Sequence, residues 1–172
     1  DSGVPDDVNT PQTCLLLDLA GTWRLDLTVT DLYAEDGPFH VAQVQVGVRP
    51  DQDIHVQLIW DTPGDPDQTD GDGSDVDLHV RRHHGNWAQA PFDCYSANAA
   101  PDWGPAGPDG DPSLDIDDVN GAGPENINLN VPENDKTYEV AVHYWNDHAY
   151  GASFITVRVY IYQVLVFELS NV

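Results

Sequence analysis

The sequence predicts an all-β protein, a β-sandwich of the Ig-like or jelly-roll type with long Asp-rich loops. Polar and apolar residues alternate with a period of two in many short segments, as in strands that bury one face. The 172 residues include 14 Gly and 13 Pro and no Met, a composition that favours turns over helices. No segment shows a convincing 3.6-residue period. Many short strands separated by turns indicate a sandwich.

The first half of the chain begins with a polar segment, residues 1–13, of the kind that is ordered only when another chain or element holds it. Strands are expected next at 14–19, 22–31, 41–48 and 54–60. An Asp-, Pro- and Gly-rich loop at 61–74 then leads to a strand at 75–81. We expect two domains, with strands of a partial repeat in 1–50 and a sandwich in 51–172.

The second half continues with a short strand at 86–90 and a loop at 91–112 that is rich in Pro, Gly and Trp. Alternating residues then predict strands at 113–118, 126–131, 138–144, 153–161 and 164–169. No apolar run is long enough to cross a bilayer, so membrane insertion is not expected.

The charge is strongly acidic, with 30 acidic residues against 6 basic ones and a net charge of −24. Nucleic acid and anionic membranes are poor partners for such a surface. Most of the acids are Asp, which is common in turns and calcium loops. Cation binding and adaptation to a saline medium both explain this composition.

Two segments, 75–80 (DVDLHV) and 113–118 (SLDIDD), alternate carboxylates with apolar residues. Carboxylate-lined strand faces repel one another unless a cation or water screens them. Calcium prefers several hard oxygen ligands in flexible geometry. The sequence therefore predicts a calcium site; the alternative is a solvated acidic face. The expected ligands are Asp61, Asp75, Asp77, Asp115, Asp117, Asp118 and Glu125.

A transition metal is the second option for this region. His79 shares the expected strand face with Asp75 and Asp77, while His143 and His148 lie near Asp147. Two imidazoles and one carboxylate form a known type of metal site.

The two cysteines, Cys14 and Cys94, lack the spacing of a zinc knuckle. In an exported protein they would form one disulfide; the alternative is two buried thiols. Because the chain starts at Asp1, we expect export with N-terminal processing and an extracellular or cell-surface location.

No segment has the Gly-x-Ser-x-Gly pattern of a nucleophile elbow, so an enzyme is not expected. Aromatic residues in loops can stack on sugars or anchor a partner chain; the alternative is that they fill the core. The expected contact residues are Trp103, Trp145 and Tyr150.

Residues 20–31 (AGTWRLDLTVTD), followed by 41–48, resemble the last strands of a polycystic-kidney-disease-type (PKD) repeat, with Trp23 at the position of its aromatic Tyr. That family consists of Ig-like sandwiches in extracellular proteins. The resemblance covers about half of a repeat and implies an open edge and an uncovered apolar face.

Residues 54–169 resemble a secreted bacterial β-sandwich domain of uncharacterised function that accompanies adhesive modules. The shared pattern has Ala122 where the family usually has Tyr. It comprises 59–61 (IWD), 74–79 (SDVDLH), 121–126 (GAGPEN) and 143–145 (HYW).

Together these observations predict a secreted, calcium-stabilised structural or adhesive protein, with self-association into a filament or surface layer as one form of that role. Other surface proteins and carbohydrate are further candidate partners. The alternatives in function are a carbohydrate-binding module and a metal-dependent hydrolase.

Overall fold

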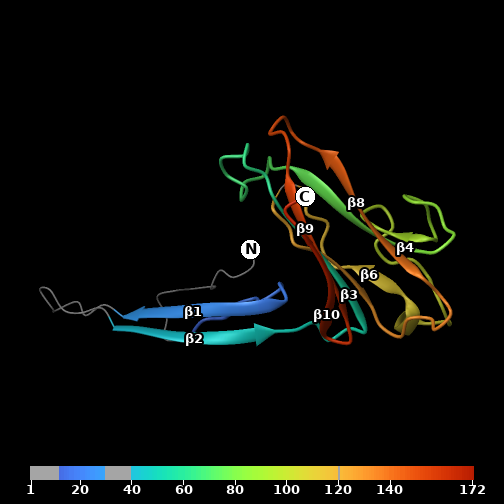
Figure 1. The fold of residues 1–172 in the computed structure, drawn as a ribbon, viewed down its shortest axis with the longest axis horizontal. Helices are drawn as coiled ribbons and strands as arrows, with labels where there is room; N and C mark the ends of the chain where they lie inside the picture. Colours follow the sequence, from blue (N-terminus) through green and yellow to red (C-terminus); the bar gives the residue numbers. More distant parts are fainter. Residues whose placement is uncertain (1–11, 30–39, 120) are drawn as a thin grey trace, which may run out of the picture. The chain divides into compact units, whose positions relative to one another are not determined.

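The computed structural model describes residues 12–29, 40–119 and 121–172 (Figure 1). The chain divides into two compact units, residues 1–49 and residues 50–172. The segment 1–13, for which a holding partner was expected, is described only from residue 12.

The first unit contains two antiparallel strands, β1 (Gly21–Val29) and β2 (His40–Val48). Trp23 faces Val46 and Leu25 faces Val44 across the pair, so apolar residues gather on one face. Leu27 and Val44 on that face are 62% and 54% exposed. The expected strand at 14–19 does not form: these residues have no regular secondary structure, and the Leu19 carbonyl accepts the indole N–H of Trp23 over 2.9 Å.

The second unit contains two antiparallel sheets. The larger sheet has the order β10-β9-β3-β7-β6 and the smaller has the order β5-β4-β8. The strands of the larger sheet are β3 (Ile54–Asp61), β6 (Pro112–Leu114), β7 (Glu125–Leu129), β9 (Phe154–Ile161) and β10 (Val164–Ser170). Those of the smaller sheet are β4 (Asp75–Arg82), β5 (Asp93–Cys94) and β8 (Tyr138–Asn146). The described residues contain one helical turn, the 3-10 turn Pro108–Gly110, and no helix able to span a membrane.

The hydrophobic core lies between the two sheets. Alternate residues of β3, including Leu58, pack with alternate residues of β4, including Leu78, and both of these side chains are fully buried. Trp103, Ile127 and Val157 complete the same cluster. The prediction of an all-β sandwich is thus confirmed.

Two expected strands differ from the structure. Residues 86–90 form a turn, in which Ala88 has a φ of 53° and donates its N–H to the Asp93 carboxylate. The strand expected at 113–118 is regular only to Leu114. One further backbone bond to β7 follows, from the Asp115 N–H to the Asn126 carbonyl over 2.9 Å, and residues 116–118 then follow an irregular path. Asp115 and Asp117 consequently do not share a strand face.

Both cysteines are free thiols, so the predicted Cys14–Cys94 disulfide is absent from the structure. Cys94 is buried in the core, where its Sγ donates to the Ala99 carbonyl over 3.4 Å. Burial raises the pKa of this thiol to about 12. Cys14 is exposed, so the alternative of a buried thiol holds for Cys94 alone.

Candidate metal centre

Strand β4 sends its residues alternately to the core and to a polar cavity. Val76, Leu78 and Val80 enter the core, while Asp75, Asp77 and His79 occupy the opposite face. All three polar residues are nevertheless buried, with at most 9% exposure. Such burial of charged groups requires partners or a bound ion.

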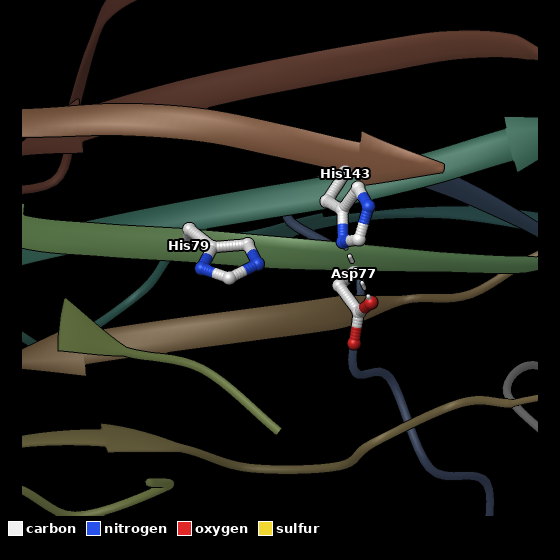
Figure 2. A group of neighbouring side chains, drawn as sticks. All are labelled: Asp77, His79 and His143. Carbon is white, nitrogen blue, oxygen red and sulfur yellow. Dashed lines mark ion pairs between the residues drawn. The ribbon is translucent and has the colours of Figure 1, made fainter. Parts of the chain in front are cut away.

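Three side chains on this face converge. Asp77, His79 and His143 each offer one ligand atom, and these atoms lie within 4.8 Å of one another. His143 lies on β8 directly opposite Asp77 on β4, and its Nδ1 is 3.7 Å from Asp77 Oδ2. Figure 2 shows a ring nitrogen of His143 paired with the Asp77 carboxylate and one ring nitrogen of His79 on the side that faces these two residues.

His79 is held in place by its surroundings. Its Nδ1 lies 2.7 Å from Oδ2 of the fully buried Asp93 at the start of β5. Tyr95 stacks on the imidazole with a centroid separation of 4.9 Å. With Nδ1 bound to Asp93, Nε2 is the nitrogen that faces Asp77 and His143. A carboxylate behind a histidine is the arrangement that orients metal-ligating imidazoles in proteins.

A cavity of about 430 Å³ adjoins the three residues. Asp75 and Asp117 also line it, as do Tyr95 and the exposed Trp145. Burial, together with the nearby Asp77 and Asp117 carboxylates, raises the pKa of Asp75 to about 6. Partial desolvation and the charges of Asp77 and Asp118 raise the pKa of Asp117 as well. The cavity therefore concentrates carboxylates that need a counter-charge.

Glu125 and Asp118 support the cavity wall through hydrogen bonds to the backbone. The Glu125 carboxylate accepts the N–H of Leu78 over 2.7 Å and that of Asp118 over 3.1 Å. Asp118 in turn accepts the N–H of Gly123 over 2.9 Å. Burial raises the pKa of Glu125 to about 8, against the lowering effect of the two N–H donors. Each Glu125 oxygen thus has a backbone partner, and the cavity lining does not include this residue.

Two further predicted calcium ligands lie outside the cavity lining. Asp61 accepts a hydrogen bond from Gln68, and Asp115 accepts one from Asn128. His148, considered for a transition-metal site, has its Nδ1 2.7 Å from the Gly73 carbonyl and is not one of the three converging residues. Of the seven expected calcium ligands, the structure brings together Asp75, Asp77 and Asp117 around the cavity.

Asp93 and Tyr95 were not expected at the site. Both lie within the loop expected at 91–112, and nothing in the sequence of that loop indicates contact with His79. The pairing of β5 with β4, in which Val80 faces Cys94, brings both residues beside the histidine.

The expected contact aromatics divide into two kinds. Trp103 is only 1% exposed and stacks on Tyr138 in the core, so its prediction as a contact residue is wrong. Burying the large apolar ring of Trp103 in the core stabilises the fold more than leaving the ring exposed to solvent. Trp145 is 68% exposed and lies edge-on to His143. Tyr150 is partly exposed.

Two imidazole nitrogens and a carboxylate oxygen form a donor set suited to a first-row divalent ion such as Zn²⁺. An ion held by these three residues would keep coordination positions for other ligands from the adjoining cavity. Comparison with family models, curated proteins and solved structures gives no significant match, so the PKD-type and secreted-domain resemblances stay predictions.

Proposed function

We propose that this chain is a cation-stabilised structural or adhesive β-sandwich module that acts outside the cell. The observation that supports the cation-stabilised part of this role is the convergence of Asp77, His79 and His143 with Asp93 behind His79. A cation there would link β4 to β8 through their side chains and neutralise carboxylates that the fold buries. We infer a contribution to stability and assign no catalytic step to the site.

A transition metal suits these three residues better than calcium does. Calcium favours six to eight oxygen ligands, whereas imidazole nitrogen favours zinc and its neighbours. The predicted calcium therefore stays a proposal for the carboxylates of Asp75 and Asp117, which lie beside the trio of Asp77, His79 and His143.

Thermal unfolding with and without metal tests this role. A ligand that binds only the folded state stabilises it by mass action. At free Zn²⁺ about a hundred times the dissociation constant, Tm should rise by about 5–10 °C in a chain of this size. His143→Ala should abolish the rise, and His83→Ala, which removes an exposed histidine outside the trio, should preserve it. An equal rise with NaCl at matched ionic strength would indicate simple screening and contradict the proposal.

A second candidate role, self-association, is supported by uncovered apolar surface in each unit. The face of β1 and β2 that carries Leu27 and Val44 is exposed. In the other unit, a groove of about 510 Å³ runs between β8 and the β9–β10 pair. Apolar residues line it: Val140, Ala141, Val142, Ile155, Val157, Val159, Phe167 and Leu169. Exposed sheet faces and edges favour pairing with another chain.

A further inference from the structure

We propose a second cation site in the same cavity, next to the trio, that takes Ca²⁺ or a similar hard divalent ion. Asp75 and Asp117 are its ligands, and Asp77 is shared with the ion held by His79 and His143. This inference rests on the proposed role of the trio as a metal site and adds a second ion to it.

The first observation is the unpartnered oxygen of Asp75. This side chain is only 9% exposed and lines the cavity, and its Oδ1 is buried without a hydrogen-bond partner in the structure. A buried carboxylate oxygen without a partner is costly. A cation in the cavity supplies the missing partner.

The second observation is the position of Asp75 relative to Asp77. The two are i and i+2 on β4, so their Cα atoms lie about 7 Å apart on one face. The register between β4 and β8 shifts between Asp75 and Val76, where Asp75 pairs with Asn146 and Val76 with Tyr144. Irregularities of this kind re-aim side chains beside functional sites. Two ions that share a carboxylate typically lie about 3.5–4 Å apart, a spacing that fits between these two residues.

Asp117 enters the cavity from the irregular segment after β6. Its neighbour Asp118 is tied to Glu125 through its N–H and to Gly123 through its carboxylate. These bonds fix the backbone beside Asp117, which lines the cavity together with Asp75 and Asp77.

The donor atoms around the cavity suit two different ions. The cavity is lined by the three carboxylates Asp75, Asp77 and Asp117 and by two histidines that ligate as neutral imidazoles. One divalent ion bound by Asp77, His79 and His143 leaves the carboxylate oxygens of the buried Asp75 and the exposed Asp117 without a cation. The oxygens of Asp75 and Asp117, together with water in the open cavity, match the oxygen preference of Ca²⁺.

Binding stoichiometry tests the inference. Metal-free protein is titrated with Zn²⁺, then with Ca²⁺, and followed by calorimetry and native mass spectrometry. The full chain should bind one Zn²⁺ and one Ca²⁺. Asp75→Asn and Asp117→Asn should each weaken Ca²⁺ binding at least tenfold and leave Zn²⁺ affinity within about threefold, whereas His143→Ala should do the reverse. Asp77→Asn should weaken both, and Asp102→Asn, at an exposed position outside the cavity, neither.

The two proposals fail in different ways. If Zn²⁺ binds and Ca²⁺ does not bind, or displaces Zn²⁺ from the same site, the second site is wrong and the trio stands. If Ca²⁺ binds as described and Zn²⁺ does not, the trio is wrong. Loss of Zn²⁺ affinity in both Asp75→Asn and Asp117→Asn would mean a single mixed site and would overturn the inference. Asp117 is the more exposed of the two residues, so its variant reports on binding even if Asp75→Asn unfolds.

Discussion

At the scale of single residues, the arrangement of His79 depends on a buried carboxylate. Asp93 is fully buried, and its Oδ2 contacts both His79 Nδ1 and the N–H of Ala88. This keeps the imidazole in one orientation and tautomer. The geometry of the trio therefore depends on a residue that would not itself touch the metal.

Asp93→Asn should weaken Zn²⁺ binding by about 10–100-fold, the usual cost of losing a carboxylate behind a histidine ligand. The amide has nearly the same shape but no negative charge, so the imidazole loses basicity and its preferred tautomer. Competition against a chromophoric chelator measures the change. Asp109→Asn, at an exposed position in the 3-10 turn, is the matched control. Unchanged affinity in Asp93→Asn would show that the contact does not tune the site.

The raised carboxyl pKa values predict how the metal-free protein responds to pH. The pKa of Glu125 rises from 4.5 to about 8 on folding and that of Asp75 from 3.8 to about 6. The folded state thus binds more protons than the unfolded state between about pH 4 and pH 8, and the free energy of unfolding should fall as pH rises through this range. Urea unfolding in chelator at several pH values measures it.

The Glu125→Gln variant isolates the contribution of that residue to the pH dependence. The amide cannot ionise, so the fall in stability between about pH 6 and pH 8 should become shallower than in the unaltered chain. A steeper fall, or stability that rises across this range in the unaltered metal-free protein, would contradict the assignment.

At the scale of elements, β4 contributes side chains both to the hydrophobic core and to the polar cavity. Its Val76, Leu78 and Val80 side chains build the core, and the residues between them line the cavity. The strand is paired on one side with β8 and on the other with β5. Core packing therefore holds the backbone from which Asp77 and His79 project.

Leu78→Ala should lower the free energy of unfolding by about 2–5 kcal/mol, because this side chain is fully buried and its loss leaves a cavity. Leu165→Ala, on the exposed strand β10, should cost under about 1 kcal/mol. Denaturant unfolding of both variants gives the comparison. Equal losses would mean that burial in this core does not determine stability.

At the scale of the whole molecule, charge governs association. A net charge of −24 makes copies of the chain repel one another at low ionic strength. The groove lining includes no charged residue, and the apolar residues of β1 and β2 alternate with Asp26, which points to the opposite face. These surfaces are places where two copies can meet without carboxylates facing each other.

Self-association should accordingly increase with salt and with Ca²⁺, since both screen the repulsion. Sedimentation velocity of the full chain across NaCl concentrations measures it. Leu27→Asp in β1 and Phe167→Asp in β10 should each reduce association. If the β1–β2 face of one copy binds the groove of another, the double variant should associate no more weakly than either single variant. Thr28→Asp, on the polar face of β1, controls for added charge. A single monomeric species at high salt with Ca²⁺ would leave a monomeric module as the better account.

The sequence by itself determined the fold class and most of the strands. Period-two alternation marked β3, β4, β8 and β9 because each buries one face against the core, and that pattern is local. The same pattern placed Asp75, Asp77 and His79 on one face of β4, as observed. The burial of Trp103 depends on a loop folding over the core, which no local pattern encodes, so the sequence does not distinguish it from an exposed loop aromatic.

Only the tertiary structure decided which carboxylates meet. Asp61 and Asp115, like Asp75 and Asp117, are carboxylates in or beside expected strands. In the structure they lie outside the cavity lining and accept hydrogen bonds from Gln68 and Asn128. His143 reaches Asp77 through the register of β4 with β8, and Asp93 reaches His79 through the pairing of β5 with β4. Pairing between strands distant in the sequence depends on the packing of the whole sandwich, so residue spacing alone could not locate the site.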